Sequence, residues 1–183
     1  MTASAAILKT TGMVEVIVRN AMDRALQDLE RKRSWSSWLI DAPLDRRGLD
    51  DLRTARDRAT RFGRHSASHG KVVAELTLGF WRYLAASRYL TSLWTPALHR
   101  AFPGGPSDKL TRQRHVDRHL KNLLLVRNRA AHGEPIHRRD LLKDQASAIS
   151  LATWVDATAG RWVADLSPVQ HVMARKPVPP SAR

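Results

Sequence analysis

Apolar residues recur every three, four or seven positions along much of the chain, a spacing that places them on one face of an α-helix. From about Ser4 to Arg33 they are separated by charged residues without any proline, which predicts one long amphipathic helix. The same spacing predicts four further helices, over residues 70–86, 87–102, 109–132 and 140–166. Almost no alternation with a period of two is present, so the expected fold is all-α.

The segments between these helices carry the residues that interrupt helical structure. Residues 34–49 and 103–108 are rich in serine, proline or glycine and predict loops. Residues 50–63 predict a short, highly charged helix closed by a glycine, which forms an excursion after the first long helix. Residues 87–102 predict either one helix or a helix pair, with a bend at Pro96.

Length and composition indicate one folded domain. The chain has 183 residues, 43% of them hydrophobic, and its six tryptophans are expected to be core and interface anchors. We assign residues 1–168 to a single helical domain. Residues 169–183 form a basic, proline-rich tail that we expect to be disordered.

The charge balance favours a polyanionic partner. Lysine and arginine outnumber aspartate and glutamate by 31 to 17, giving a net charge of +14, which suits RNA, DNA or an acidic protein. Most of the basic residues are arginine, and a GC-biased genome produces the same enrichment, so charge alone does not decide. The chain has no cysteine, no apolar run long enough for a membrane span and no signal pattern at its N-terminus, so we expect a cytoplasmic protein without membrane attachment.

The predicted helix over residues 109–132 carries a charged residue on its apolar side. Helical spacing places six residues on that side: Val116, Leu120, Leu123, Leu124, Arg127 and Ala131. An unpaired charge there is unfavourable, so Arg127 needs an anion, an interface or solvent at the helix end. Either an internal carboxylate such as Glu15 or Glu75 pairs with it, or it binds an anionic ligand.

Two polar residues beside Arg127 suggest phosphodiester chemistry. His132 lies about 140° further around a straight helix, and Gly133 and Pro135 predict that the helix ends there. Asn128 precedes His132 by one helical turn, so its amide is placed to orient the imidazole or to bind a phosphate oxygen. Histidine exchanges protons near neutral pH, and an arginine in a low dielectric stabilises charge that develops on phosphorus.

The segment VRNRAAHGEPI, residues 126–136, resembles the R-xxxx-H signature of HEPN domains, specifically the Abi-like branch linked to abortive infection. Three further segments follow in the order of that family: VEVIVRNAMDRAL (14–26), LTLGFWRYL (76–84) and LWTPALHRAFP (93–103). The resemblance therefore covers residues 10–165.

This resemblance implies a HEPN-like helical bundle that forms a homodimer and cuts RNA in a shared cleft without a metal ion or a cofactor. The ribose 2′-OH would attack its own phosphate and leave 2′,3′-cyclic phosphate and 5′-OH ends. His132 would be the general acid/base, Arg127 would stabilise the pentacoordinate phosphate, and Asn128 would position one or the other. Further residues would guide the RNA: Arg114, Arg118, Lys121, Arg129, His137 and Arg138. The implied role is a toxin or antiphage effector, with an antitoxin protein as a further partner.

The chain departs from the family pattern next to the signature. Many Abi-like members carry a second histidine directly after the motif histidine, where this chain has Gly133, with His137 four positions later as a substitute. The chain also begins close to the first family helix. A catalytically inactive HEPN-like module that binds RNA, a nucleotide or a partner protein is the alternative.

Two histidine pairs have a spacing that allows metal binding from one helix face. They are His115 with His119 and His65 with His69. Neither pair has the glutamate of a zinc-protease helix, and the flanking arginines would repel a divalent cation. We therefore interpret these positions as a solvated basic face and expect no metal site.

Overall fold

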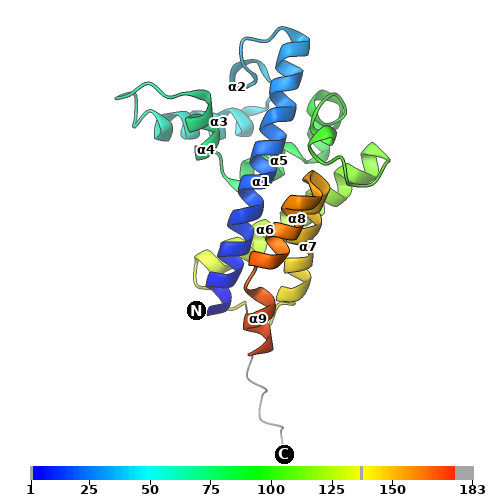
Figure 1. Cartoon of the computed structure of the whole chain (residues 1–183). Coiled ribbons are helices and arrows are strands. Elements are labelled where there is room, and N and C mark those ends of the chain that lie inside the picture. Colours follow the sequence, from blue (N-terminus) through cyan, green and yellow to red (C-terminus); the bar gives the residue numbers. More distant parts are fainter. Residues whose placement is uncertain (1, 137, 176–183) are drawn as a thin grey trace, which may run out of the picture.

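The chain is organised around one long helix, α1 (Thr2–Arg33), which confirms the first predicted helix (Figure 1). The computed structural model describes residues 2–136 and 138–175, and this part of the chain is all-α, with no strand. Along α1 the side chains of Val14, Val18 and Leu26 are fully buried, as their spacing predicts. None of the described helices combines the length and the apolar character needed to cross a bilayer.

Three helices from the second half of the chain complete a bundle with α1. These are α6 (Lys109–Ala131), α7 (Leu141–Val155) and α8 (Ala157–Leu166). Helices α6 and α7 pack against α1 and against each other, and α8 folds back along α7 (Figure 1). Val126 of α6 lies in one buried cluster with Ile7 near the start of α1, while Leu120 joins the main core, so the two helices run in opposite directions.

The single helix predicted over residues 140–166 is wrong, because the helix is interrupted at Asp156. The backbone of Asp156 is extended, and its carboxylate accepts hydrogen bonds from the backbone N–H groups of Thr158 and Ala159 at 2.7 and 3.1 Å. This is an N-cap, so α8 starts as a new helix. The turn removes the continuous face that we expected, and Trp162, expected as an anchor, is 47% exposed.

Part of the segment predicted to be a disordered tail is helical. Residues Val169–Ala174 form α9, which packs on α1 and α7. Val169 is buried in the same cluster as Ile7. The prediction of disorder is therefore wrong for the residues of α9. Residues 176–183 lie outside the described part of the chain.

The excursion after α1 contains more helix than the sequence predicted. It consists of α2 (Trp38–Asp41) and α3 (Arg46–Ala59). The helices α4 (His69–Glu75) and α5 (Leu78–Leu84) follow it. The charged helix starts earlier than expected because the side chain of Asp45 caps it, accepting a hydrogen bond from the N–H of Gly48 at 3.1 Å. Trp38, which we placed in a loop, is fully buried against Phe80 and Trp81.

The helices predicted over residues 70–86 and 87–102 are each divided. Leu76 and Thr77 have extended backbone, so α4 ends before α5 begins. The next segment forms three short turns, η1 (Ser87–Tyr89), η2 (Leu90–Trp94) and η3 (Leu98–Ala101), in place of a helix bent at a proline.

The turn between α3 and α4 has three successive residues with left-handed backbone. The φ angles are +50° at Arg61, +57° at Phe62 and +80° at Gly63. Only the glycine adopts this conformation without a steric cost from its side chain. The side chain of Phe62 is also 81% exposed, so the burial of its ring does not offset the steric cost of the backbone conformation.

Replacing Phe62 with glycine is therefore expected to raise the free energy of unfolding by about 0.5 to 1 kcal/mol. The relief of the strained backbone exceeds the entropy that glycine adds to the unfolded chain. Urea unfolding followed by circular dichroism measures the change. Phe62→Leu retains the Cβ atom and should show no gain; an equal gain in both variants would contradict the role of the backbone.

Candidate functional site

Helix α6 ends in a way that places His132 at the surface. His132 is the C-cap residue of the helix, and Gly133 follows it with a φ of +70°. The N–H of Gly133 donates to the carbonyl of Ala130 at 3.4 Å, and the N–H of Glu134 donates to the carbonyl of Arg129 at 2.9 Å. These two bonds form a Schellman motif, which reverses the chain after the helix. The predicted end of the helix is confirmed, and the His132 side chain is exposed.

Arg127 lies at the border of the buried face of α6 and is half buried. Its Nη1 donates a long hydrogen bond of 3.4 Å to the Oδ1 of Asn128. Within residues 2–136 and 138–175 it forms no ion pair, so the alternative in which Glu15 or Glu75 neutralises it is not realised there. The positive charge of Arg127 is thus available to an anion from outside.

The buried face of α6 differs from the predicted one in its second half. The buried apolar residues are Val116, Leu120, Leu123, Val126 and Ala130. Leu124 is only half buried and Ala131 is exposed. The face shifts because the end of α6 packs towards the start of α1 and towards α7, whose residues Ile7 and Leu141 share a cluster with Val126. Arg127 therefore flanks the buried stripe and is not enclosed by it.

A polar face runs along α6 on the side away from the core. Its members repeat at three, four or seven positions and are all exposed: Arg114, Arg118, Lys121, Asn128 and His132. We call these five residues the α6 polar face. It joins three of the predicted RNA-guiding residues to two of the predicted catalytic ones.

The other predicted residues lie apart from the α6 polar face or have different contacts. The Nε atom of Arg129 lies 3.6 Å from a carboxylate oxygen of Glu134, so an acidic neighbour already engages its charge. Arg138 is exposed in the turn before α7, and His137 lies outside the described residues. The amide of Asn128 contacts Arg127, and no side-chain hydrogen bond from it to His132 is formed in the described part of the chain. Of the two residues that Asn128 was expected to position, its side chain contacts Arg127 and not His132 in the described part of the chain.

The prediction of a solvated face at His115 and His119 is wrong. The indole ring of Trp154 packs on both imidazoles, with centroids 6.2 Å from His115 and 5.2 Å from His119. The Nδ1 of His119 is buried without a hydrogen-bond partner among the described residues. Burial, together with the charges of Arg118 and His115, lowers the pKa of His119 below its ordinary value. This histidine is neutral and belongs to the packing between α6 and α7.

Lowering the pH is expected to destabilise the protein through His119. The folded pKa lies below the unfolded value of about 6.5, so the unfolded chain binds more protons as the pH falls. His119 makes its full contribution to the free energy of unfolding when the pH is above the unfolded pKa. This contribution is lost as the pH falls through the lowered pKa of the folded state. We expect the free energy of unfolding to decrease more between about pH 7.5 and pH 5.5 in the wild type than in His119→Gln, by urea unfolding. Equal decreases would show that His119 is not the titrating group.

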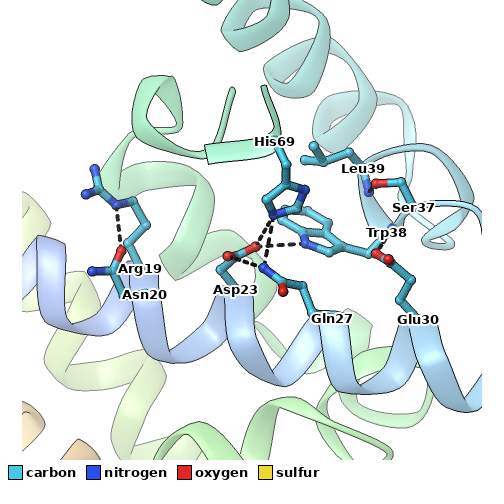
Figure 2. Close-up of polar contacts among 9 residues, drawn as sticks. All are labelled: Arg19, Asn20, Asp23, Gln27, Glu30, Ser37, Trp38, Leu39 and His69. Atoms are coloured by element: carbon cyan, nitrogen blue, oxygen red, sulfur yellow. Dashed lines mark hydrogen bonds and ion pairs between the residues drawn. The ribbon is translucent and has the colours of Figure 1, made fainter. Parts of the chain in front are cut away.

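A second polar cluster ties α2 and α4 to α1 (Figure 2). The carboxylate of Asp23 accepts hydrogen bonds from Trp38 Nε1 at 2.9 Å and from Gln27 Nε2 at 2.7 Å. His69 Nε2 lies 2.8 Å from the same carboxylate and must carry a proton, because a carboxylate only accepts. The nearby Gln27 Nε2, 3.2 Å from His69 Nε2, also carries hydrogens, so these two nitrogens do not bond to each other.

The Asp23 cluster is best explained as a structural tie. The Asp23 side chain is only 13% exposed and that of His69 is 34% exposed. No serine or threonine hydroxyl bonds to His69 in the described chain, so the cluster lacks a hydroxyl nucleophile. His65, expected on the same face as His69, is exposed and separate from it. The sequence missed this cluster because its members come from α1, α2 and α4.

No group of three or more histidine, aspartate or glutamate side chains is arranged to hold a metal ion in the described part of the chain. The chain gave no match to models of known protein families, to curated proteins or to solved structures.

Proposed function

We propose that this protein binds RNA at the end of α6 and cleaves it without a metal ion, in the manner expected of a HEPN ribonuclease. The observation that carries the proposal is a half-buried Arg127, not neutralised by a carboxylate of the described chain, on the same helix end as an exposed His132 five residues further on. An arginine partly removed from water binds a phosphate more strongly than a fully solvated one. The net charge of +14 favours the same partner.

In the proposed reaction, His132 removes the proton of the ribose 2′-OH, whose oxygen then attacks the adjacent phosphorus. The bond from phosphorus to the 5′ oxygen breaks, and that oxygen takes a proton from an imidazolium. The products are a 2′,3′-cyclic phosphate and a 5′-OH. Arg127 stabilises the negative charge on the pentacoordinate phosphate, and Asn128 holds the guanidinium by its side-chain oxygen.

Two copies of the chain would supply the acid and the base together. On the helix surface Arg127 and His132 are about 140° apart, and the Schellman motif turns the chain away directly after His132. A two-fold interface at the end of α6 would bring His132 of one protomer to Arg127 of its partner. The homodimer, the antitoxin partner and the role as an antiphage effector belong to this proposal.

The deciding experiment is cleavage of labelled single-stranded RNA by the purified full chain in EDTA, with analysis of the product ends. We expect 2′,3′-cyclic phosphate ends, no cleavage when the ribose at the cut position is 2′-deoxy, and a loss of at least about 100-fold in rate for His132→Ala. Arg127→Gln should lose rate to a similar extent. Arg56→Gln removes the same charge from the exposed face of α3 and is the matched control.

Two outcomes would reject the proposed reaction. If His132→Ala cleaves as fast as the wild type, His132 is not the acid/base. If the wild type binds RNA without cutting it, with or without added metal, the chain is a binding module, which is the alternative that the sequence left open.

A further inference from the structure

A surface cavity of about 460 Å³ lies between the second half of α1 and η3, with Val155 at the end of α7 on its border. The part of α1 that lines the cavity is distant from Ile7, whose side chain packs beside the end of α6. No residue of α6 lines it. This cavity is therefore separate from the α6 polar face and from the chemistry proposed there.

Three arginines line the cavity, together with a single carboxylate. Arg24 and Arg31 come from α1, and Arg100 comes from η3. The carboxylate is Asp28, which forms an ion pair with Arg31. Arg24 and Arg100 have no ion pair with any carboxylate in the described ranges 2–136 and 138–175. Two guanidinium groups from elements distant in the sequence are thus brought together around one hollow, and neither is paired with the carboxylate that lines it.

The hollow exists because its floor is made of small residues. Ala21 and Ala25 of α1 and Ala101 of η3 are buried beneath it, each 5% exposed. Pro103 and Val155 add apolar surface at the sides. A cavity with an apolar floor and wall, and with two arginines that no carboxylate of the described chain neutralises, suits a ligand that has an apolar body and an anionic end.

We propose that this cavity binds a small phosphate monoester whose organic body is about the size of a nucleoside. Arg24 and Arg100 hold the phosphate through charge-assisted hydrogen bonds, which the planar guanidinium group forms in pairs with phosphate oxygens. The organic body lies over the alanine floor against Pro103 and Val155. Small-molecule sites commonly have volumes of about 300 to 1,000 Å³, a range that includes this cavity. The proposal does not depend on the function proposed for the end of α6.

The test is isothermal titration calorimetry of the full chain with adenosine 5′-monophosphate and uridine 5′-monophosphate, beside the parent nucleosides and inorganic phosphate. We expect one monophosphate per chain to bind more tightly than either the nucleoside or inorganic phosphate. Arg24→Gln and Arg100→Gln should each weaken binding by about tenfold or more. Both side chains are exposed, so circular dichroism should show unchanged folding.

Two controls separate this site from the rest of the molecule. Arg56→Gln removes an equal charge elsewhere and should leave binding unchanged, and so should His132→Ala, which tests the α6 site. The proposal is overturned if neither monophosphate binds saturably, or if the Arg24→Gln, Arg100→Gln double variant binds as the wild type does. Binding of inorganic phosphate as tight as that of the monophosphates would overturn the role of the organic body. Loss of monophosphate binding in His132→Ala alone would assign the ligand to the α6 end instead.

Discussion

Replacing Asp23 with alanine is expected to lower the free energy of unfolding by about 3 kcal/mol, because a buried donor then loses its acceptor. Trp38 is fully buried, and its Nε1 donates to the Asp23 carboxylate at 2.9 Å. Gln27 and His69 lose the same acceptor. Denaturation in urea, followed by tryptophan fluorescence and circular dichroism, measures the effect on the whole fold.

Asp28→Ala is the matched control for Asp23→Ala. Asp28 lies on the same helix and pairs with Arg31 at the exposed surface. Surface ion pairs contribute little, so this variant should lose less than about 1 kcal/mol. If both variants lose the same amount, the cluster in Figure 2 does not hold α2 and α4 to α1.

Gly160→Ala is expected to destabilise the protein by about 3 kcal/mol, because the contact between α7 and α8 leaves no space for a methyl group. A Cβ atom at this position would lie 2.0 Å from Thr153 Oγ1 and 2.9 Å from both Thr153 Cα and Cβ. The backbone atom cannot rotate away, so the two helices must separate. Thermal and urea unfolding both report the loss.

Replacing another helical glycine with alanine should change the free energy of unfolding in the opposite direction. A Cβ atom at Gly12 of α1 would meet nothing within 4 Å. Gly12→Ala is therefore expected to raise the free energy of unfolding by about 0.5 to 1 kcal/mol, since alanine favours the helix. A gain at Gly160, or a loss of equal size at Gly12, would contradict the explanation by packing.

The two long helices α1 and α6 could be predicted from the sequence because local signals agree over their whole length. The apolar spacing continues through both, and Gly133 marks where α6 ends. The breaks at Thr77 and Asp156 could not be found by spacing, because apolar residues continue on both sides of each. Asp156 offered a local sign as a helix-capping residue, but aspartate occurs at many other positions. The burial of Trp38 depends on packing between distant helices, which no local pattern reports.

The candidate site could be predicted in part for similar reasons. Arg118 and Lys121, which the resemblance named as RNA-guiding residues, are exposed on α6, because exposure on a helix follows from position around its axis. The packing of His119 on Trp154 is a tertiary contact between α6 and α7. The spacing of residues on one helix does not show which side chains of another helix pack against it. For this reason a solvated histidine pair was expected where Trp154 contacts the imidazoles.

The helix end at Gly133 bears on the resemblance to the HEPN signature, in which many proteins carry a second histidine at this position. Its φ of +70° belongs to the left-handed region, where a histidine would cost about 1 to 2 kcal/mol. A second histidine at this position would therefore require α6 to end differently. In this chain Gly133 fixes the direction in which the backbone leaves His132. A glycine directly after His132 is thus accounted for by the conformation of this helix end alone.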